Sequence, residues 1–576
     1  MTLPSYVPTQ EQQDIIDHAG AAFVTACPGA GKTRTMVERA RQLLNHLADR
    51  RGIAFLSFTN AAVDELESRL RAFGVLPTPL FPSFIGTFDR FLWQFLIAPF
   101  GIPGCDQILK LIPDKDNWEV KPYDAAQPLR LRCFDRATGN VDAALAKDEG
   151  FDVGTRQIGA YQTRARYIIK NALSHGQVDF EDVRVCVRER LADSAFAKRI
   201  GAALAARFRE IVVDEAQDCN PADLAIANWL RAAGIAVKVI CDPNQSIYEF
   251  RGGVTHELQT FSKTFATKDR LPMSGNFRST PAICAAIVAL RPPSTRSDPD
   301  RPLGRWRNDL TPVHILSYGG SAVSPAIGPT FQELIERLGI PLPASPVLAS
   351  TRASASKAIG QPTIEPTNHM TLLLAEAAMN YHFAFALGNR RDALVSLHRI
   401  ILLVQGRISA LGSYHTYLMS EGLDDGRWRP EVIALANSLR FDSTDTADKW
   451  LGRARGLLMA GLVGSSTINQ RLKVHTDLAT ALAGAPTNSP PARTIHSAKG
   501  QEFPAVCVVM TTKTAGAILD LLEGQASTGA DEEARKIYVG ASRAQRLLTI
   551  AIPKSRATRL QTLLTNGGCD IMLHQI

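Results

Sequence analysis

The sequence predicts an α/β fold with two cores, each interrupted by a mostly helical insertion. The first observation is a Gly-rich turn, ACPGAGKT at residues 26–33, between an apolar run at 21–25 and a helical pattern. The second is that short apolar strands alternate with amphipathic helices around this turn and again near the C-terminal end. The third is that two long stretches, 97–206 and 365–486, are almost all helical and break that alternation.

The Gly-rich turn has the composition of a phosphate-binding P-loop. Gly29 and Gly31 let backbone N–H groups converge on phosphate oxygens at the start of a helix. Lys32 can reach the β- and γ-phosphates of ATP, and the Thr33 hydroxyl can hold Mg²⁺. Ala26 stands where the general pattern has its first glycine, so the match is to a common variant. The alternative is a chance Gly-rich turn. The predicted nucleotide-binding residues of the turn are Ala26, Cys27, Pro28, Gly29, Ala30, Gly31, Lys32 and Thr33.

Composition narrows the class of protein. The chain has 576 residues, enough for several domains, and its 64 Lys and Arg against 56 Asp and Glu give a net charge of +8. That excess suits a phosphate-rich partner, although basic globular proteins without such a partner are about as common. Nine cysteines occur singly with no CxxC pair, which argues against a zinc or iron–sulfur site and favours a reducing compartment. Without a signal-peptide pattern or a membrane-length apolar run, a cytoplasmic protein is expected.

Polar residues follow the predicted strands of the first core. IAFLSFTN at 53–60 is predicted to be a strand, and the helix after it ends at Gly74. REIVVDEAQD at 209–218 predicts a buried strand with Asp214 at its end, where the carboxylate can hold Mg²⁺ beside the P-loop. Glu215 is then placed to orient and deprotonate the attacking water.

The rest of the chain follows the same alternation. LPMSGNFRST at 271–280 is predicted to open the second core, and 291–302 is a Pro-rich surface loop. After Pro490, a strand–turn–strand pattern and a final helix and strand complete that core. The expected layout is a first core of 1–96 and 207–264 with insertion 97–206, and a second core of 265–364 and 487–576 with insertion 365–486.

About seven motifs, in order from Gln12 to Arg543, resemble those of the UvrD/Rep/PcrA family of superfamily 1 DNA helicases. The resemblance implies two RecA-like domains around one ATP, with single-stranded DNA crossing their tops. Taken alone, Gln12 fits a capping box with Thr9, but a glutamine can also offer a donor and an acceptor to adenine. The resemblance implies that Gln12 and Arg34 flank adenine, that Phe277, where the family usually has Tyr, stacks on the base, and that Glu502 binds the ribose. It further implies that Asp214 holds Mg²⁺ and that Glu215 is the catalytic base. The residues implied to contact the γ-phosphate are Gln245, Arg278 and Arg543.

Other motif positions match DNA contacts of the family. Aromatic side chains stack on any base, so they suit a track that ignores sequence. Without its motif, Phe250 would be interpreted as a core aromatic, and His496 as a buried, hydrogen-bonded histidine. The implied DNA-binding residues are Phe58, Thr59, Thr87, Tyr248, Phe250, Arg251, Thr494 and His496.

The chain also departs from the family pattern. Asp89 stands where many relatives carry His, Gln501 replaces a usual Leu, and Gly540-Ala541-Ser542 replaces Ala-Leu-Thr before Arg543. No catalytic group is lost. The second insertion, about 120 residues, is smaller than in full-size relatives. Shortened members also occur as subunits of anti-phage defence systems, such as the GajB-like helicases of Gabija.

The expected function is an ATP-dependent helicase or translocase that moves 3′ to 5′ on single-stranded DNA, in repair, replication or anti-phage defence. Expected partners are single-stranded DNA, single-strand–duplex junctions, and a protein such as a repair or defence nuclease, since no convincing nuclease motif is visible. One alternative is a DNA-stimulated ATPase that strips proteins from DNA. The other is a nucleotide-gated DNA-binding subunit whose partner performs the chemistry.

Overall fold

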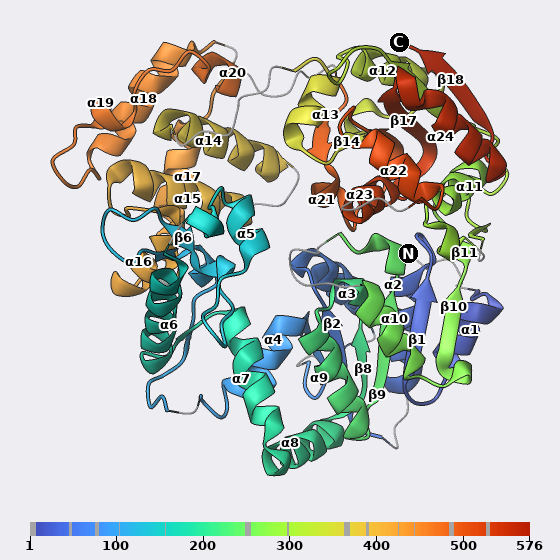
Figure 1. The fold of residues 1–576 in the computed structure, drawn as a ribbon, viewed down its shortest axis with the longest axis horizontal. Helices are drawn as coiled ribbons and strands as arrows, with labels where there is room; N and C mark the ends of the chain where they lie inside the picture. The colour runs from blue at the N-terminus through green and yellow to red at the C-terminus, as the bar shows by residue number, and fades with distance from the viewer. Residues whose placement is uncertain are drawn as a thin grey trace. The chain divides into compact units, whose positions relative to one another are not determined.

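The structure is a computed structural model, and it divides the chain into two compact units. Unit 1 comprises Met1–Leu96, Arg188–Thr363 and Thr487–Ile576, and unit 2 comprises Ile97–Val187 and Ile364–Pro486. Both large sheets belong to unit 1, whereas helices α14–α20 belong to unit 2 (Figure 1). The described residues are 7–44, 49–74, 76, 80–102, 104–155, 157–247, 255–296, 299–361, 369–386, 391–423, 426–442, 444–482, 489–525 and 530–576.

The first core is built on a six-stranded, fully parallel sheet in the order β10-β1-β9-β8-β2-β3. Its strands are β1 Ala22–Ala26, β2 Gly52–Ser57, β3 Phe84–Thr87, β8 Phe208–Val213, β9 Ala236–Cys241 and β10 Arg270–Met273. Strands β2 and β9 are buried almost throughout, as expected for parallel strands covered on both faces. Its helices are α1 Gln10–Asp17, α2 Lys32–Leu44, α3 Asn60–Ala72, α4 Phe88–Leu92, the π-helical turn Trp93–Ile97, α8 Ser194–Arg207, α9 Pro221–Ala232 and α10 Thr255–Lys263.

Two predicted features of this core need correction. Strand β10 was expected to open the second core, but it pairs with β1, with Phe23 opposite Arg270. A short apolar strand can join either sheet, and the alternation along the sequence does not say which. The strand predicted at 53–60 ends at Ser57, because the Thr59 side chain caps α3 by accepting from the Ala62 N–H.

The second core has its own six-stranded parallel sheet, in the order β15-β14-β16-β17-β13-β18. Its strands are β13 Val313–Tyr318, β14 Val347–Ala349, β15 Ala492–Thr494, β16 Phe503–Val509, β17 Ala544–Pro553 and β18 Ile571–Gln575, and β11 Gly275–Asn276 forms a separate parallel pair with β12 Arg301–Pro302. Its helices are α11 Pro281–Ala289, α12 Ile327–Arg337, α13 Arg352–Ala358, α21 Ile495–Ala498, α22 Ala515–Leu522, α23 Asp531–Ala541 and α24 Lys554–Asn566.

Alternate residues of the second sheet enter different hydrophobic clusters. Val506 and Val508 pack in one cluster with residues of α11, α22, α23 and α24. Cys507 and Val509, between and after them, pack in another cluster with residues of α12 and α13. The two-residue period of a strand therefore produces a sheet covered on both faces.

The Pro-rich segment 291–302 is not only a surface loop. Arg291 and Asp300 are both buried and form an ion pair of 2.5 Å. Arg301–Pro302 is strand β12. Residues 297–298 lie outside the described part of the chain. The surface prediction therefore fails at both ends of the segment, where charged groups are buried as a pair.

Unit 2 is mostly helical and joins two segments that are far apart in sequence. Asp114 pairs with Arg399 at 3.4 Å, and a Cβ placed on Gly412 would lie 2.6 Å from the carbonyl oxygen of Asn117. Its helices are α5 Ala143–Asp148, α6 Ile158–Ser174, α7 Phe180–Ala192 (whose last turn lies in unit 1), α14 Met370–Ala386, α15 Arg391–Gln405, α16 Tyr414–Ser420, α17 Arg429–Ser438, α18 Ala447–Met459, α19 Ile468–Arg471 and α20 Leu478–Leu482, with short strands β4 Lys110–Leu111, β5 Glu119–Val120, β6 Leu129–Arg130 and β7 Gln177–Val178.

The first insertion was predicted to run to residue 206, whereas unit 2 ends its first segment at Val187. Helix α8 lies with the first core. A Cβ placed on Gly201 would come 2.8 Å from the Cβ of Ala233, at the end of α9. Close helix packing therefore holds α8 in unit 1. Within the described residues, no helix is both long and apolar enough to cross a membrane.

Candidate active site

The Gly-rich turn connects β1 to α2. Gly29 and Gly31 have φ angles of +72° and +78°, in the left-handed region that glycine adopts readily. Helix α2 begins at Lys32 and runs for 13 residues, so its first N–H groups face the turn without intrahelical partners. Thr33 lies in the same first turn. This is the backbone geometry that binds phosphate groups.

A segment of the second core lies directly against this turn. The Phe277 N–H donates to the carbonyl of Gly29 at 2.9 Å. A Cβ on Gly29 would come 2.6 Å from the Cβ of Arg278 and 2.7 Å from Oδ1 of Asn276. The Phe277 side chain is 37% exposed, and its Cδ2 lies 4.0 Å from the Cβ position of Gly31. The ring is therefore beside the P-loop and open enough to stack on a base.

Lys32 and the two acids after β8 form one charged group. The Lys32 Nζ donates to Oε1 of Glu215 at 2.7 Å, and the Glu215 N–H donates to Oδ1 of Asp214 at 2.9 Å. Burial opposes the charge on Lys32, but Glu215 and Asp214 outweigh it and raise the pKa of Lys32. Burial would also raise the pKa of Glu215, but the charge of Lys32 lowers it.

Glu215 has a φ of +55° and is the sole non-glycine residue with a positive φ in the described part of the chain. This left-handed conformation costs roughly 1–3 kcal/mol at a residue that is not glycine, and such strain is typical of functional sites. In this conformation the Glu215 carboxylate accepts from Lys32. The backbone therefore holds this acid in place at an energetic cost.

The side chains at this point fit Mg²⁺. Burial raises the pKa of Asp214, so a further cation next to that carboxylate would be favourable. The Thr33 hydroxyl and the Asp214 carboxylate are oxygen donors, and Mg²⁺ commonly takes one or two protein oxygens and fills its other positions with water and phosphate. Among the described residues, no cluster of three or more His, Cys, Asp or Glu side chains could hold a metal ion.

Two arginines reach this region from the second core. Arg543 follows α23 and is buried, and its Nη2 donates to Oε1 of Gln245 at 2.5 Å. Arg278 donates from Nη1 to the carbonyl of Ser542 at 2.7 Å and from Nη2 to Oε1 of Glu502 at 2.5 Å. Burial and the charge of Arg278 lower the pKa of Arg543 to about 10, which leaves it charged at neutral pH.

The residues implied as adenine contacts have other partners here. The Gln12 side chain accepts from the Thr9 N–H at 3.0 Å and donates to the Ala30 carbonyl at 2.9 Å, so it forms the capping box and also braces the P-loop. The Arg34 guanidinium lies 4.4 Å from the centre of the Phe73 ring. Glu502, implied as a ribose contact, pairs with Arg278.

The implied DNA contacts that the structure describes lie at carboxyl ends of parallel strands. Thr59, Thr87 and Thr494 follow or end β2, β3 and β15, and each caps the next helix by accepting a backbone N–H at 3.2–3.3 Å. The Phe58 ring stacks on Phe88, with centroids 5.6 Å apart and planes 12° apart. His496 Nε2 lies 3.2 Å from the carbonyl of Ile247. Tyr248, Phe250 and Arg251 lie outside the described residues.

Two family models match the chain. The UvrD/REP helicase N-terminal domain matches residues 8–266, and the UvrD-like helicase C-terminal domain matches residues 477–555. Together they cover more than half of the chain. The chain belongs to the UvrD/REP helicase family. The predicted fold class, two RecA-like α/β domains with helical insertions, is confirmed.

Several relatives agree with this assignment. UvrD2 of Mycobacterium tuberculosis, named as an ATP-dependent DNA helicase, is 24% identical over 606 residues, which cover 97% of this chain and 81% of UvrD2. YjcD of Bacillus subtilis, which carries the name of an ATP-dependent DNA helicase, is 25% identical over 330 residues, 54% of this chain and 41% of YjcD. DNA helicase II of Haemophilus influenzae is 27% identical over 287 residues, 47% of this chain and 38% of that protein. The chain thus spans about two fifths of the last two.

The departures of this UvrD-like helicase from the family pattern have local explanations. Gln501 accepts from Arg493 Nη1 at 2.9 Å, a contact that leucine could not make. A Cβ on Gly540 would lie 3.2 Å from Val508, so glycine lets α23 pack closely on β16. The Ser542 hydroxyl accepts from Arg543 Nη2 at 3.0 Å and helps hold the arginine. Asp89 lies in the first turn of α4, where a negative charge is favourable.

Sequence reasoning missed some residues that the structure places at the candidate site. Asp218, the last residue of DEAQD, binds Lys499 Nζ through both oxygens, at 2.7 and 2.6 Å. Tyr538 donates to Asp242 at 3.0 Å. Thr351 follows β14 and caps α13, which repeats the strand–Thr–helix arrangement of the implied DNA contacts. That repeated pattern was visible in the sequence, whereas the two polar pairs join residues 281 and 296 positions apart and gave no local signal.

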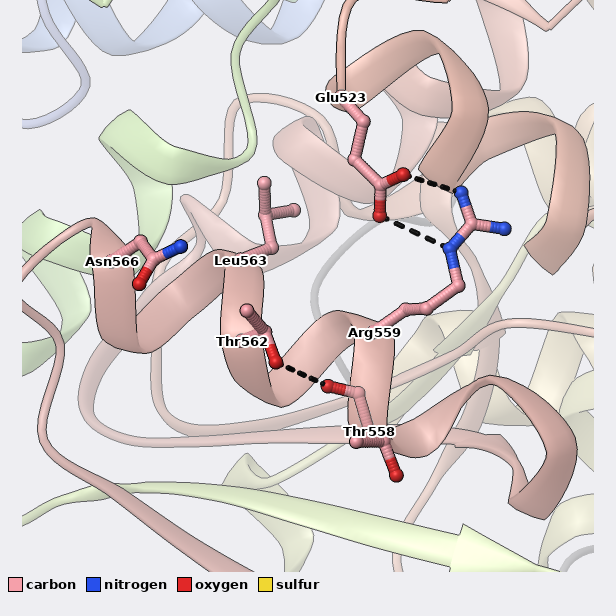
Figure 2. Close-up of a pocket in the computed structure, with 6 residues that line it drawn as sticks. All are labelled: Glu523, Thr558, Arg559, Thr562, Leu563 and Asn566. Atoms are coloured by element: carbon pink, nitrogen blue, oxygen red, sulfur yellow. Dashed lines mark hydrogen bonds and ion pairs between the residues drawn. The ribbon is translucent and has the colours of Figure 1, made fainter.

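A surface pocket of about 270 Å³ lies elsewhere in the second core, on α24 and at the end of α22 (Figure 2). Arg559 donates to Glu523 from Nε at 3.1 Å and from Nη2 at 2.6 Å, and it also pairs with Asp520 at 2.7 Å. Thr562 donates to the Thr558 carbonyl at 3.0 Å. Because its charged groups neutralise one another, we assign no ligand to it.

Proposed function

We propose that this helicase is an ATP-dependent translocase that moves 3′ to 5′ on single-stranded DNA, driven by Mg²⁺-dependent hydrolysis of ATP. The main support is the arrangement across the two cores. Arg278 lies against the P-loop and Arg543 binds Gln245, while the P-loop and Glu215 belong to the first core. Cations supplied by a second domain to a developing phosphoryl charge make hydrolysis depend on domain closure.

The residues of the first core divide the chemistry among themselves. When bound, Mg²⁺ would be held by Thr33 and Asp214 and would neutralise charge on the β- and γ-phosphates. Lys32 binds the same phosphates, which draws it away from Glu215. Oε1 of Glu215 is then free to accept a proton from the attacking water.

DNA would be held at the carboxyl ends of the strands. The capped helix starts at Thr59, Thr87, Thr351 and Thr494 present first-turn N–H groups that suit phosphate oxygens, and Phe58 offers a partly exposed ring. The net charge of +8 suits the same polyanion.

The 3′-to-5′ direction of movement rests on the family resemblance. The cores carry these groups, so we expect translocation to survive the small second insertion, while unwinding by the isolated chain should be weak.

We also propose a cytoplasmic setting in DNA repair, replication or anti-phage defence, with single-stranded DNA and junctions as substrates and a nuclease as a protein partner. All nine cysteines are free of disulfide bonds, which supports a reducing compartment.

The test is ATP hydrolysis with and without single-stranded DNA, followed by strand displacement on 3′-tailed, 5′-tailed and forked duplexes. We expect strong stimulation by single strands and displacement only where a 3′ tail is present. Stimulated hydrolysis without displacement, even with added partner or excess enzyme, would favour the protein-stripping ATPase. DNA binding that responds to ATP without turnover would favour the nucleotide-gated subunit. Displacement from 5′ tails would contradict the direction.

A further inference from the structure

We propose that Asp242 is a positioning residue that connects the arginine finger Arg543 to the catalytic base Glu215, and that Tyr538 couples this connection to closure of the two cores. This inference rests on the proposed ATP hydrolysis. The sequence alone indicated no role for Asp242 or Tyr538. Both are buried, so their contacts are made away from water.

A continuous series of hydrogen bonds carries the proposal. Arg543 Nη2 donates to Gln245 Oε1 at 2.5 Å, and Gln245 Nε2 donates to Asp242 Oδ2 at 2.8 Å. The Asp242 N–H donates to Gln217 Oε1 at 3.1 Å, and Gln217 Nε2 donates to Oε2 of Glu215. The four residues from Arg543 to Gln217 are each at most 4% exposed. Finger and base are thus joined through three intermediate residues.

The direction of each bond is fixed by chemistry. An ionised carboxylate only accepts, so Asp242 requires Gln245 to turn its NH₂ group inward. The Gln245 carbonyl oxygen is then left facing Arg543. In the same way, the Asp242 N–H can only donate, which turns the Gln217 oxygen toward it and the Gln217 NH₂ toward Glu215. Residue 242 therefore orients both glutamine amides, Gln245 through the aspartate carboxylate and Gln217 through the backbone N–H. A buried network of this kind is stable only when every member is satisfied.

Two of these contacts come from the second core. Tyr538 lies in α23 and donates to Asp242 Oδ2 at 3.0 Å, and Arg543 lies two positions beyond the end of the same helix. Burial and the charge of Asp242 raise the pKa of Tyr538, so its hydroxyl stays protonated and able to donate. Gln217 and Asp242 follow the neighbouring strands β8 and β9 of the first core. When the cores separate, Asp242 and Gln245 each lose a partner at once, and the amides are free to rotate.

The experiment compares Tyr538→Phe with Tyr318→Phe. The first variant removes only the hydroxyl that reaches Asp242. The second removes an equally buried hydroxyl of the same core, which donates to the Met510 carbonyl at 2.8 Å and lies outside the relay. We expect Tyr538→Phe to lower kcat for DNA-stimulated ATP hydrolysis by about 10- to 100-fold, the range for losing one hydrogen bond to a buried charge. KM and the Kd for a fluorescent ATP analogue should change less than threefold, and Tyr318→Phe should keep the wild-type kcat.

Asp242→Asn, which keeps the side-chain shape, provides the second measurement. We expect a similar fall in kcat, and adding Tyr538→Phe to Asp242→Asn should lower kcat no further. Wild-type kcat in Tyr538→Phe, an equal loss in Tyr318→Phe, or full additivity with Asp242→Asn would overturn the proposal. If the wild-type chain itself hydrolyses no ATP, the proposed function fails, and that outcome is distinct from failure of the relay.

Discussion

Gly304 offers a way to move the arginine-bearing segment without touching the P-loop. It follows β12 and lies against the backbone of Phe277. A Cβ at residue 304 would lie 2.0 Å from the Phe277 carbonyl oxygen and 2.4 Å from its carbonyl carbon. Because ordinary contact begins near 3.4 Å, Gly304→Ala must displace that backbone by about 1.4 Å. The next residue, Arg278, would move with it.

The expected cost follows from this displacement. Misplacing a catalytic group by about 1 Å lowers rates by on the order of 100-fold, so we expect kcat for DNA-stimulated ATP hydrolysis to fall by about that factor. Overpacking should also lower the free energy of unfolding by about 1–3 kcal/mol. Steady-state hydrolysis and urea unfolding measure the two effects.

The matched control is Gly319→Ala. No atom lies within 4 Å of the Cβ position of Gly319, and its φ is not in the left-handed region. Its unfolding free energy should stay within about 0.5 kcal/mol of wild type, with unchanged hydrolysis. If Gly304→Ala matched this control in kcat, the close approach of Gly304 would not position Arg278, and the reasoning from backbone distance would be wrong.

Three further predictions concern the base, the finger and unit 2. Glu215→Gln should retain ATP binding by filter assay while hydrolysis collapses, and substantial remaining turnover would place the base elsewhere. Arg543→Lys should lower kcat by on the order of 10³, because an ammonium lacks the forked donor geometry, and near-normal kcat would refute a bidentate role. Burial, despite Arg399, raises the pKa of Asp114 from 3.8 to about 6, so the folded state keeps a proton that the unfolded state releases. The free energy of unfolding of unit 2 should therefore fall by about 2–3 kcal/mol as pH rises from about 4 to 6. Amide hydrogen exchange at pH 4.5 and 7 tests this expectation, and Asp114→Asn should make the stability of unit 2 less dependent on pH.

Local patterns carried most of what the sequence predicted correctly. The capping box of Thr9 and Gln12 spans four residues, and the turn from β1 to α2 is one contiguous motif. Such features depend on neighbours along the chain, so spacing and residue type are enough to predict them. The same holds for Asp214 and Glu215 after a buried strand. The strained φ of Glu215, however, was not predictable from its residue type.

Apart from the end of strand β2, which a local helix cap decides, the corrections involve contacts between distant parts of the chain. Strand β10 has four residues and could pair in either sheet, and only its register with β1 decides. Arg291 and Asp300 lie in a Pro-rich segment that predicts an exposed loop, yet both are buried and their charges are paired. Hydrophobic periodicity describes one element at a time, so it cannot show which sheet an element joins or which charges meet.

The contacts between the two cores explain why closure can be reversible. Among the described residues, the buried polar pairs that join them include Asp218 with Lys499, Asp242 with Tyr538, and Gln245 with Arg543. The interior of each core is apolar. An equally apolar contact surface between the cores would lose its hydrophobic stabilisation whenever the cores separated. Polar groups instead regain hydrogen bonds with water on opening, so their net contribution to closure is small. They are satisfied only in one relative placement of the cores, however, since an unpaired buried charge is costly. Polar contacts between the cores therefore give a closed state that is well defined in geometry and weak in energy, which suits the repeated opening that the proposed hydrolysis cycle requires.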